Sequence, residues 1–245
     1  MDRAVFDRMA AQEELHWWFA ARREIIRSVI ERLLHLPDRP RILEAGCGTG
    51  GNLGMLAGFG QVRAFELDAE ARRVAAAKSG LAVAEGALPN AVPFETERFD
   101  LIGLFDVLEH VEDDEAALRA LRGRLAPNGR IVLTVPAFPW LWSRHDERHH
   151  HFRRYTRQHL AKVGQRAGLH VEHGFYFNTL LFPVAVAQRA LKAACGLDRA
   201  DDTLPPLALN AAMRSVFAAE RHLVGRLSLP VGLSLCAVLA DAGKP

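Results

Sequence analysis

The sequence has few cysteines, no long apolar run and little net charge, and each of these absences excludes a class of protein. Cys47, Cys195 and Cys236 are odd in number and far apart, which argues against a disulfide framework or a cysteine metal site and favours a reducing cytoplasm. No segment holds the run of about eighteen apolar residues that a membrane span needs, and the N-terminus has no apolar signal core. A formal charge of +2 argues against nucleic acid as a partner of the whole molecule.

The chain has, in contrast, ample material for a large α/β core. Of its 245 residues, 49% are hydrophobic, and strand-like segments alternate with helical ones, which is typical of βαβ units and a parallel sheet. We expect strands over 41–45, 62–66, 81–84, 99–105, 130–135, 169–177 and 232–239. We expect one domain over 1–245, made of a helical cap at 1–36, a ligand-binding core at 37–177, a two-helix insertion at 178–230 and a last strand and tail at 231–245.

The insertion carries the most apolar helix of the chain. Its two helices are expected over 179–195 and 206–227, and the first is apolar nearly all round at its start. A helix of this kind has to be covered. Core packing, a homodimer contact, a lid over a binding site and contact with a membrane surface would each cover it, and the sequence leaves these alternatives open.

Residues 41–50, Arg-Ile-Leu-Glu-Ala-Gly-Cys-Gly-Thr-Gly, are the most informative segment, because an apolar strand runs into a glycine-rich turn. Such a turn lets a ligand approach the backbone and leaves N–H groups free at the start of the next helix. Gly46, Gly48 and Gly51 satisfy the dinucleotide pattern, with Glu66 at the distance of a ribose-binding acid, so a nicotinamide cofactor is one interpretation. Glu44 favours another, because a carboxylate repels a pyrophosphate but suits the ammonium group of S-adenosylmethionine.

The sequence resembles the class I S-adenosylmethionine-dependent methyltransferases, whose first motif is matched by Glu44, Gly46, Gly48 and Gly50. Segments 99–102, 106–111 and 125–129 match further regions of that family, and nicotinamide enzymes have no reason to carry this set. The resemblance covers residues 14–177. It implies a doubly wound, seven-stranded, mostly parallel Rossmann-like sheet and a methyltransferase activity.

The resemblance also implies how the cofactor is held. Glu66 would reach the ribose hydroxyls, and Arg22, four residues from Trp18 on one helix face, would meet the cofactor carboxylate. Gly86 stands where the family often has an acid, so the adenine would be held by the backbone around 86–88 or by Glu85 in a shifted register. The cofactor-binding residues expected are Trp18, Arg22, Glu44, Gly46, Cys47, Gly48, Gly50, Asn52, Glu66, Leu67, Gly86, Ala87, Leu88, Phe105 and Leu108.

Asp106, His110 and His151 are the candidate catalytic residues, since a hydroxyl acceptor has to lose its proton. Asp106, Glu109 and His110 would share one face if their segment is helical. Together with His151 this pattern is similar to the metal-binding set of the small-RNA 2′-O-methyltransferases, although Asp106 departs from it. The similarity implies that Glu109, His110 and His151 bind a divalent ion such as Mn, Fe, Co or Zn. Without a metal, His110 or His151 would act as the general base.

The tract from 144 to 157 holds the only dense group of arginines, namely Arg144, Arg148, Arg153, Arg154 and Arg157. They would attract an anionic acceptor, unless they pair with Asp146 and Glu147. Aromatic residues at 136–142 are a candidate lid beside them. We predict methylation of a small molecule at oxygen. The alternatives are a lipid-linked or phosphorylated glycan at a membrane surface, the 2′-oxygen of RNA, and cofactor binding without catalysis.

Overall fold

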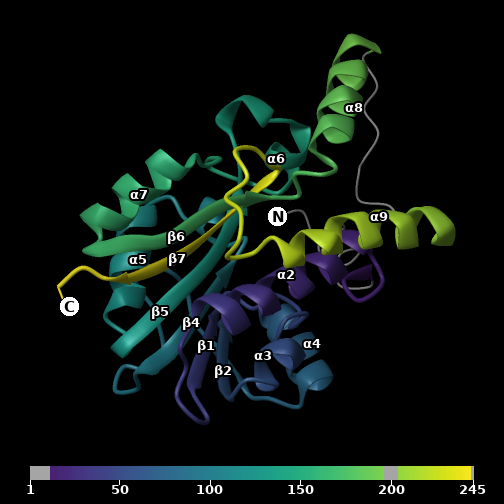
Figure 1. The fold of residues 1–245 in the computed structure, drawn as a ribbon. Coiled ribbons are helices and arrows are strands. Elements are labelled where there is room, and N and C mark those ends of the chain that lie inside the picture. The colour runs from purple at the N-terminus through teal and green to yellow at the C-terminus, as the bar shows by residue number, and fades with distance from the viewer. Residues whose placement is uncertain (1–11, 196–203, 244–245) are drawn as a thin grey trace.

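A computed structural model describes residues 12–195 and 204–243, and their strands form a single sheet (Figure 1). The strands are β1 Arg41–Ala45, β2 Gln61–Glu66, β3 Val83–Glu85, β4 Phe99–Phe105, β5 Leu125–Pro136, β6 Leu169–Phe177 and β7 Ser234–Asp241. Their order is β3-β2-β1-β4-β5-β7-β6, and only β7 runs antiparallel to its neighbours. The predicted seven-stranded, mostly parallel sheet is therefore confirmed.

Helices cover both faces of this sheet (Figure 1). They are α2 Trp17–Leu33, α3 Leu53–Ala57, α4 Ala69–Ser79, α5 Asp114–Arg122, α6 Arg144–Arg148, α7 Arg157–Arg166, α8 Phe182–Cys195 and α9 Leu207–Ala219, with 3-10 turns η1 Leu108–His110, η2 Pro139–Leu141 and η3 Glu220–His222. Among the helices of the described ranges, none has the length and apolarity needed to cross a membrane. The part of the expected N-terminal helix that falls on residues 5–11 lies outside the described residues.

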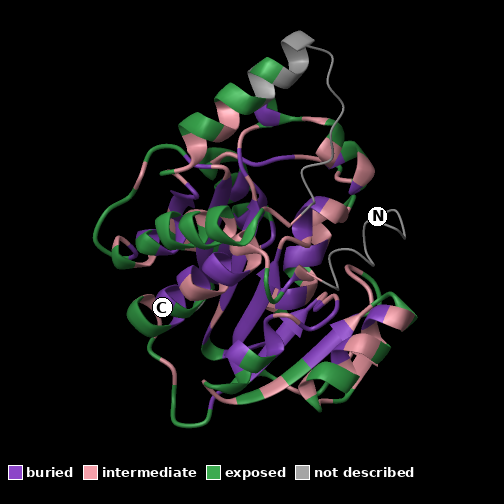
Figure 2. Cartoon of the chain, turned by 90° about the vertical axis from the view of Figure 1, so that its right-hand side faces the viewer, coloured by how far each residue is buried: buried purple, intermediate pink, exposed green. Residues whose placement is uncertain are grey.

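The two insertion helices differ in how they pack. Phe217 of α9 is buried between α2 and the sheet, where it stacks on Phe177 and meets Trp17 edge to face. In contrast, α8 projects from the body and shows mostly exposed and intermediate residues (Figure 2). Val184 and Leu191 on α8 are 65% and 63% exposed, so core packing does not cover this helix within the described residues.

The boundaries of some elements differ from the predicted ones for local reasons. β5 begins at Leu125 and not at 130, because the stretch through Asn128 (φ 66°) stays in the strand as an irregularity in the register with β4. α9 ends at Ala219, where the chain continues as the 3-10 turn η3, and the Glu220 Oε1 accepts hydrogen bonds of 2.7 Å from the backbone N–H groups of Thr179 and Leu180.

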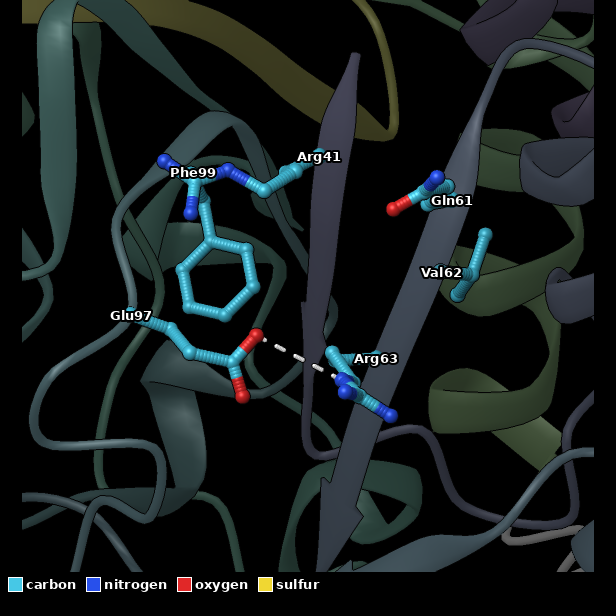
Figure 3. Close-up of a pocket in the computed structure, with 6 residues that line it drawn as sticks. All are labelled: Arg41, Gln61, Val62, Arg63, Glu97 and Phe99. Carbon is cyan, nitrogen blue, oxygen red and sulfur yellow. Dashed lines mark hydrogen bonds and ion pairs between the residues drawn. The ribbon is translucent and has the colours of Figure 1, made fainter. Parts of the chain in front are cut away.

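The amino edge of the sheet carries a shallow pocket, lined by Arg41, Gln61, Val62, Arg63, Glu97 and Phe99 (Figure 3). Arg41 and Gln61 are the first residues of β1 and β2 and lie opposite each other. The pocket's ion pair joins Arg63 and Glu97 at 3.4 Å. Ligands of open α/β sheets bind beyond the carboxyl ends of the strands. This pocket lies at the opposite edge of the sheet, so we do not expect it to be the functional site.

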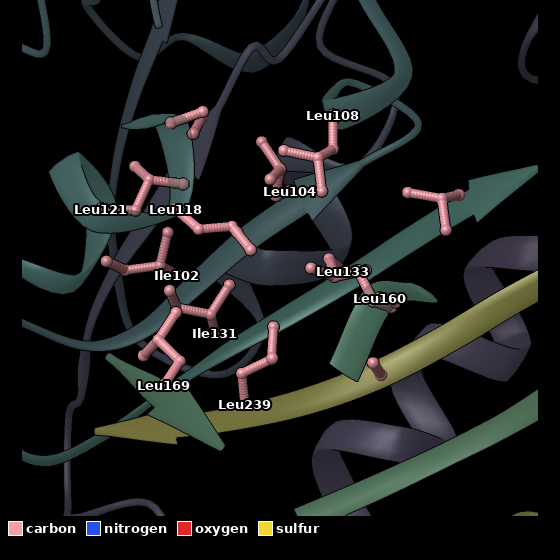
Figure 4. Packing of buried hydrophobic residues seen from close by; sticks show 14 of the residues in the cluster. Ile102, Leu104, Leu108, Leu118, Leu121, Ile131, Leu133, Leu160, Leu169 and Leu239 are labelled. Atoms are coloured by element: carbon pink, nitrogen blue, oxygen red, sulfur yellow. The ribbon is translucent and has the colours of Figure 1, made fainter. Parts of the chain in front are cut away.

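Two apolar layers hold the sheet between its helices. On one face, Leu118 and Leu121 of α5 and Leu160 of α7 pack against alternate residues of the central strands such as Ile102 and Leu133 (Figure 4). On the other face, α2 and α9 cover the intervening positions, including Leu101 of β4. A central strand buried on both faces is a continuous apolar run, which is why 99–105 was predictable to the residue.

Candidate functional site

The glycine-rich turn after β1 is folded back onto β2 by hydrogen bonds from the N–H groups of Gly46 and Cys47 to the Phe65 carbonyl, at 3.0 and 3.1 Å. Gly46, Gly48 and Gly50 all have positive φ, which favours glycine. A Cβ on Gly50 would come within 3.0 Å of Ala75 in α4, whereas a Cβ on Gly48 would meet nothing within 4 Å. Gly50 therefore allows close helix packing, and Gly48 borders open space that a ligand can enter.

Glu66, the last residue of β2, is tied to this turn. Its Oε2 accepts a 2.9 Å hydrogen bond from the Gly48 N–H, and its Oε1 accepts from the N–H groups of Leu67 and Asp68 at 2.8 and 3.1 Å. The acid expected to reach a ribose is thus held at the carboxyl edge beside the glycine turn. Leu67 itself is exposed next to it.

Glu44 is a buried carboxylate with one unpaired oxygen. Asn52 donates a 2.8 Å hydrogen bond to its Oε1, while its Oε2 has no partner among the described residues. Burial raises the pKa of Glu44 to about 8, although the Asn52 hydrogen bond and the charge of Arg22 act to lower it. A buried oxygen of this kind suits an ammonium group, because leaving it without a donor costs free energy.

Arg22 reaches from α2 to the end of β4. It forms a buried ion pair with Asp106, and its guanidinium lies 4.7 Å from the Trp18 ring centroid. Burial lowers the pKa of Arg22 to about 10, which leaves it charged near neutrality, and the carboxylates of Glu44 and Glu109 act to raise it. Trp18 and Arg22 therefore share one face of α2, as predicted. This face lies beside Glu44, whose Oε2 has no partner among the described residues.

Sequence reasoning missed Glu13, which lies directly before α2. A Cβ on Gly51 would come within 2.6 Å of the Glu13 Oε2, and Lys78 of α4 pairs with the same carboxylate. The segment before α2 thus lies over the glycine turn. No sequence pattern predicts the contact of Glu13 with Gly51, because only the fold brings these two residues together.

Gly86, Glu85 and Leu108, which were also expected near the cofactor, differ in how far they are buried. Gly86 has no room for a side chain, since a Cβ would come within 2.8 Å of both Pro93 and Phe65. Glu85 is exposed and pairs with Arg72 at 3.0 Å. The Leu108 side chain is fully buried in the apolar core.

Four further residues of the expected cofactor-binding set are buried or half-buried. Cys47 and Phe105 are buried, and burial holds the pKa of the Cys47 thiol well above its usual range. Ala87 pairs through its backbone with Ala91, and Leu88 packs partly buried against the core.

The segment after β4 is not a helix with one functional face. Asp106 has a φ of 55°, and the only helical geometry is the single turn η1. As a result, Asp106 faces Arg22, whereas Glu109 and His110 face the loop after β5. The condition for a face shared by Asp106, Glu109 and His110 is therefore not met, because the backbone at Asp106 is left-handed and not helical.

Glu109, His110 and His151 form a compact group whose nitrogen and oxygen atoms lie within 4.8 Å of one another. The rings of His110 and His151 meet edge to face, with centroids 4.6 Å apart. Burial raises the pKa of Glu109 to about 8, and burial together with His151 lowers the pKa of His110 to about 3. Burial also lowers the pKa of His151, against the effect of its hydrogen bond with Asp146.

Asp146 is the fully buried centre of the loop after β5, and sequence reasoning gave it no role beyond pairing with arginines. Its Oδ1 lies 3.0 Å from His151 Nδ1 and accepts a 2.7 Å hydrogen bond from Arg154 Nε. Its Oδ2 accepts a 2.8 Å hydrogen bond from the Ser143 N–H. Burial acts to raise the pKa of Asp146, but the hydrogen bonds from His151 and Arg154 hold it well below its usual range.

Three arginines of the tract from 144 to 157 are bonded to other residues of the protein. Arg154 is buried against Asp146, Arg153 pairs with Asp114 at 2.9 Å, and Arg157 donates a 2.9 Å hydrogen bond to Ser228. The alternative of pairing with Asp146 therefore holds for Arg154, whereas Arg153 pairs with Asp114. In the aromatic stretch, Phe138 stacks on Tyr176 at 4.6 Å while Trp140 is exposed beside Phe182.

Comparison with known proteins gives the family. A model of the methyltransferase domain matches residues 18–173, which is more than half of the chain. The chain belongs to the methyltransferase family. The match supports S-adenosylmethionine as the cofactor and leaves no support for the nicotinamide interpretation of the glycine turn.

Curated relatives of this methyltransferase are similar over part of their length. It is 30% identical to the ubiquinone biosynthesis O-methyltransferase of Xanthomonas axonopodis pv. citri over 136 residues, which cover 53% of this chain and 55% of the relative. It is 36% identical to an uncharacterized protein of Synechococcus sp. over 109 residues, covering 40% of this chain and 26% of that protein. The chain thus spans about a quarter and about half of these two relatives.

Solved structures show the same fold at low identity. The complex of the Haloferax volcanii Trm112 methyltransferase activator with its partner contains a chain that aligns with a TM-score of 0.63 at 18% identity, covering 96% of this methyltransferase and 97% of that chain. An S-adenosylmethionine-dependent methyltransferase from Mesorhizobium loti aligns with a TM-score of 0.58 at 16% identity, covering 93% and 99%. The Rossmann-like methyltransferase fold is therefore confirmed.

The site of this methyltransferase has two halves. We call Trp18, Arg22, Glu44, residues 46–52, Glu66 and Asp106 the cofactor half, and Glu109, His110 and residues 143–154 the acceptor half. The cofactor half fits S-adenosylmethionine: open space lies at Gly48, an unpaired buried oxygen lies at Glu44, and a charged guanidinium lies at Arg22.

Proposed function

We propose that this methyltransferase transfers a methyl group from S-adenosylmethionine to an oxygen atom of a small anionic molecule. The observation that carries the proposal is the adjacency of the two halves: Asp106 of the cofactor half pairs with Arg22, and Glu109, three residues later, belongs to the cluster with His110 and His151. An acceptor bound beside that cluster lies next to the methyl donor.

Within the cofactor half, each group has a distinct part in binding. Glu44 takes the cofactor ammonium, Arg22 its carboxylate, Glu66 the ribose hydroxyls, and the backbone around Gly48 lies along the ligand. Gly86, Ala87 and Leu88 lie at the carboxyl end of β3, toward the adenine. The cofactor supplies an electrophilic methyl on a sulfonium, and in-line transfer needs both partners held in place by these groups.

Oxygen is the acceptor atom that the acceptor half supports best. The group formed by Glu109, His110 and His151 offers oxygen and nitrogen atoms that assist the loss of a hydroxyl proton. A relative is named an O-methyltransferase, which agrees with this chemistry. The exposed Arg144 and the half-buried Arg148 favour an anionic acceptor at this end of the molecule.

The proposal is tested in two stages. Calorimetric titration with S-adenosylmethionine, S-adenosylhomocysteine and NAD should show micromolar binding of the first two only; preference for NAD would overturn the cofactor assignment. Release of S-adenosylhomocysteine is then measured with phenols, hydroxy acids, phosphorylated sugars and, as a matched set, amines of the same shape. Turnover on amines but not on hydroxyls would overturn the oxygen assignment, and tight binding with no turnover would favour a binding protein.

A lipid-linked acceptor is a second candidate, favoured by one observation. Val184 and Leu191 on α8 and Leu207 on α9 are 65%, 63% and 82% exposed, and the exposed Trp140 contacts Phe182 at the start of α8. An amphipathic surface of this kind binds at a lipid interface. Flotation with anionic vesicles should carry the protein into the lipid fraction, and Val184→Asp should abolish this. Protein that stays out of the lipid fraction, or a concentration-dependent dimer that covers α8, would count against the lipid-linked acceptor.

A further inference from the structure

The segment directly before α2, residues 12–16, lies across the glycine turn of the cofactor half, and we call it the lead segment. Glu13 is buried there, and a Cβ on Gly51 would come within 2.6 Å of its Oε2. On the other side, Lys78 of α4 forms ion pairs with Glu13 and, at 3.3 Å, with Glu14. A ligand bound along the glycine turn therefore lies next to the lead segment.

Asn210, in the first turn of α9, bonds the lead segment to the insertion. Its Nδ2 donates a 2.9 Å hydrogen bond to the Leu15 carbonyl, and its Oδ1 accepts a 2.9 Å hydrogen bond from the Trp17 N–H. The first N–H groups of a helix have no partner within that helix, so Asn210 caps α2 from a different helix. Both polar atoms of this one side chain are thus used on a single stretch of backbone.

Other contacts hold α9 against α2 without Asn210. The two helices lie side by side (Figure 1). Arg214 and Arg221 both pair with Glu24, at 2.9 and 2.6 Å, and Phe217 is fully buried below them. Loss of the Asn210 side chain would therefore release the lead segment and leave α9 in place. Because asparagine is a poorer helix former than alanine, Asn210→Ala should not weaken α9 itself.

The first turn of α2 leads directly into the cofactor half. Trp18 follows the capped Trp17, and the Arg22 guanidinium lies 4.7 Å from the Trp18 ring centroid. The lead segment thus joins two parts of the site, because Glu13 lies over the glycine turn while Trp18 begins the helix face that carries Arg22. Release of the lead segment would open the site on this side.

We propose that Asn210 is a positioning residue for the cofactor, which latches the lead segment over the glycine turn and so slows the exit of S-adenosylmethionine. This inference rests on the proposed binding of S-adenosylmethionine in the cofactor half. It gives the insertion a role in cofactor binding. Only molecules with a closed lead segment bind the cofactor at full strength, so the loss of two hydrogen bonds lowers the apparent affinity.

Hydrogen exchange of the ligand-free protein tests the latch. In Asn210→Ala, the N–H groups of the lead segment and of Trp17 should exchange about tenfold faster than in the wild type. Asn210→Asp keeps an acceptor for the Trp17 N–H but loses the donor to the Leu15 carbonyl, and it should be intermediate. Arg214→Ala, which removes an ion pair between α9 and α2, is the matched control and should exchange normally. Unchanged exchange in Asn210→Ala would overturn the latch.

Cofactor binding tests the positioning role. Asn210→Ala should bind S-adenosylmethionine about tenfold more weakly, mainly through faster dissociation in stopped-flow measurements, and a saturating concentration should restore slow exchange of the lead segment. Arg214→Ala should bind as the wild type does. An equal loss of affinity in Arg214→Ala would overturn the proposal, because the effect would then come from loosening of α9 as a whole.

The same measurements separate this proposal from the proposed function. A purely structural role of Asn210 would lower the midpoint of thermal unfolding and leave the affinity of the folded protein unchanged. Wild-type binding of S-adenosylmethionine with unchanged affinity in Asn210→Ala would therefore overturn the positioning role alone. A wild type that binds no S-adenosylmethionine would overturn the cofactor assignment and, with it, this role.

Discussion

The cofactor half and the acceptor half lie side by side at the carboxyl edge of the sheet but are held in different ways. In the cofactor half, strand ends and backbone groups set the geometry, as in the hydrogen bond from the Gly48 N–H to Glu66. In the acceptor half, hydrogen bonds to a side chain set the geometry, because the Asp146 carboxylate is hydrogen-bonded to Ser143, His151 and Arg154. Changes in the first half should therefore affect binding, whereas changes in the second should also affect folding.

The largest effect is expected from Asp146→Ala, which removes the centre of the acceptor half. Asp146 and Arg154 are both buried, so the change leaves an uncompensated guanidinium inside the protein. Breaking one partner of a buried pair costs about 3–5 kcal/mol of unfolding free energy, measurable by chemical denaturation. Cofactor affinity of the folded fraction should stay within about threefold of wild type.

Arg154→Met with Asp146→Asn is the matched control for that change, because it removes both charges and nearly keeps both side-chain volumes. It should recover most of the stability that Asp146→Ala loses. If Asp146→Ala is as stable as the wild type, or abolishes cofactor binding while the protein remains folded, the contrast between the two halves is wrong.

The next largest effect is expected from Gly48→Val, which should lower the stability of the turn because a β-branched residue is strained at this φ, and should weaken S-adenosylmethionine binding by about 100-fold, or about 3 kcal/mol. Gly48 has a φ of 54°, and a Cβ there meets no protein atom within 4 Å, so the new side chain would occupy the space left for the ligand. Calorimetry measures the loss. Gly54→Ala in α3, where space is also open, is the control and should bind normally.

The contrast between the halves also explains what could be predicted from sequence. β1 and β4 were located to the residue, and the glycine turn between β1 and α3 was identified, because apolar runs and glycines with positive φ follow local rules. The acid at the end of β2 was likewise placed by the general rule that ligands bind at the carboxyl edge.

Both halves also contain contacts that no local pattern predicts. In the cofactor half, the ion pair of Arg22 with Asp106 spans 84 residues, and the orientation of Asp106 follows from a left-handed backbone that its sequence neighbours do not require. The role of Asp146 depends on the fold of a loop whose charges, read along the sequence, indicate only a basic surface. Sequence therefore identified His110 and His151 as candidates but not the aspartate that positions His151.

Arg22→Ala should weaken S-adenosylmethionine binding by about 30-fold, or about 2 kcal/mol, because a charge-assisted bond to the cofactor carboxylate is lost. The discriminating ligand is 5′-methylthioadenosine, which lacks the amino-acid end and should bind wild type and variant alike. Arg27→Ala, an exposed arginine on the same helix, is the control. An equal loss for both ligands would mean that Arg22 maintains the site and does not contact the carboxylate.

The smallest effect is expected from the titration of Glu44 in the cofactor half. The unfolding free energy and the cofactor affinity should change with pH in opposite directions. Burial raises the pKa of Glu44 to about 8 from its ordinary value of 4.5, so the folded protein holds a proton that the unfolded chain releases. The contribution of Glu44 to the unfolding free energy is therefore fully present below pH 4.5 and declines as the pH rises toward 8. Arg22 stays charged throughout this range, while Glu13 and Glu66 add to the upward shift.

Cofactor binding should have the opposite pH dependence, because an ammonium beside Glu44 favours its ionised form. S-adenosylmethionine should bind more tightly as the pH rises from about 7 to 8, by at most about tenfold, with a proton released to buffer. Calorimetry in buffers of different ionisation enthalpy measures that proton. Glu44→Gln should remove the release and flatten both profiles, whereas Glu97→Gln, at the opposite edge of the sheet, should not. Proton release that persists in Glu44→Gln would assign the titrating group elsewhere and leave the ammonium without its expected partner.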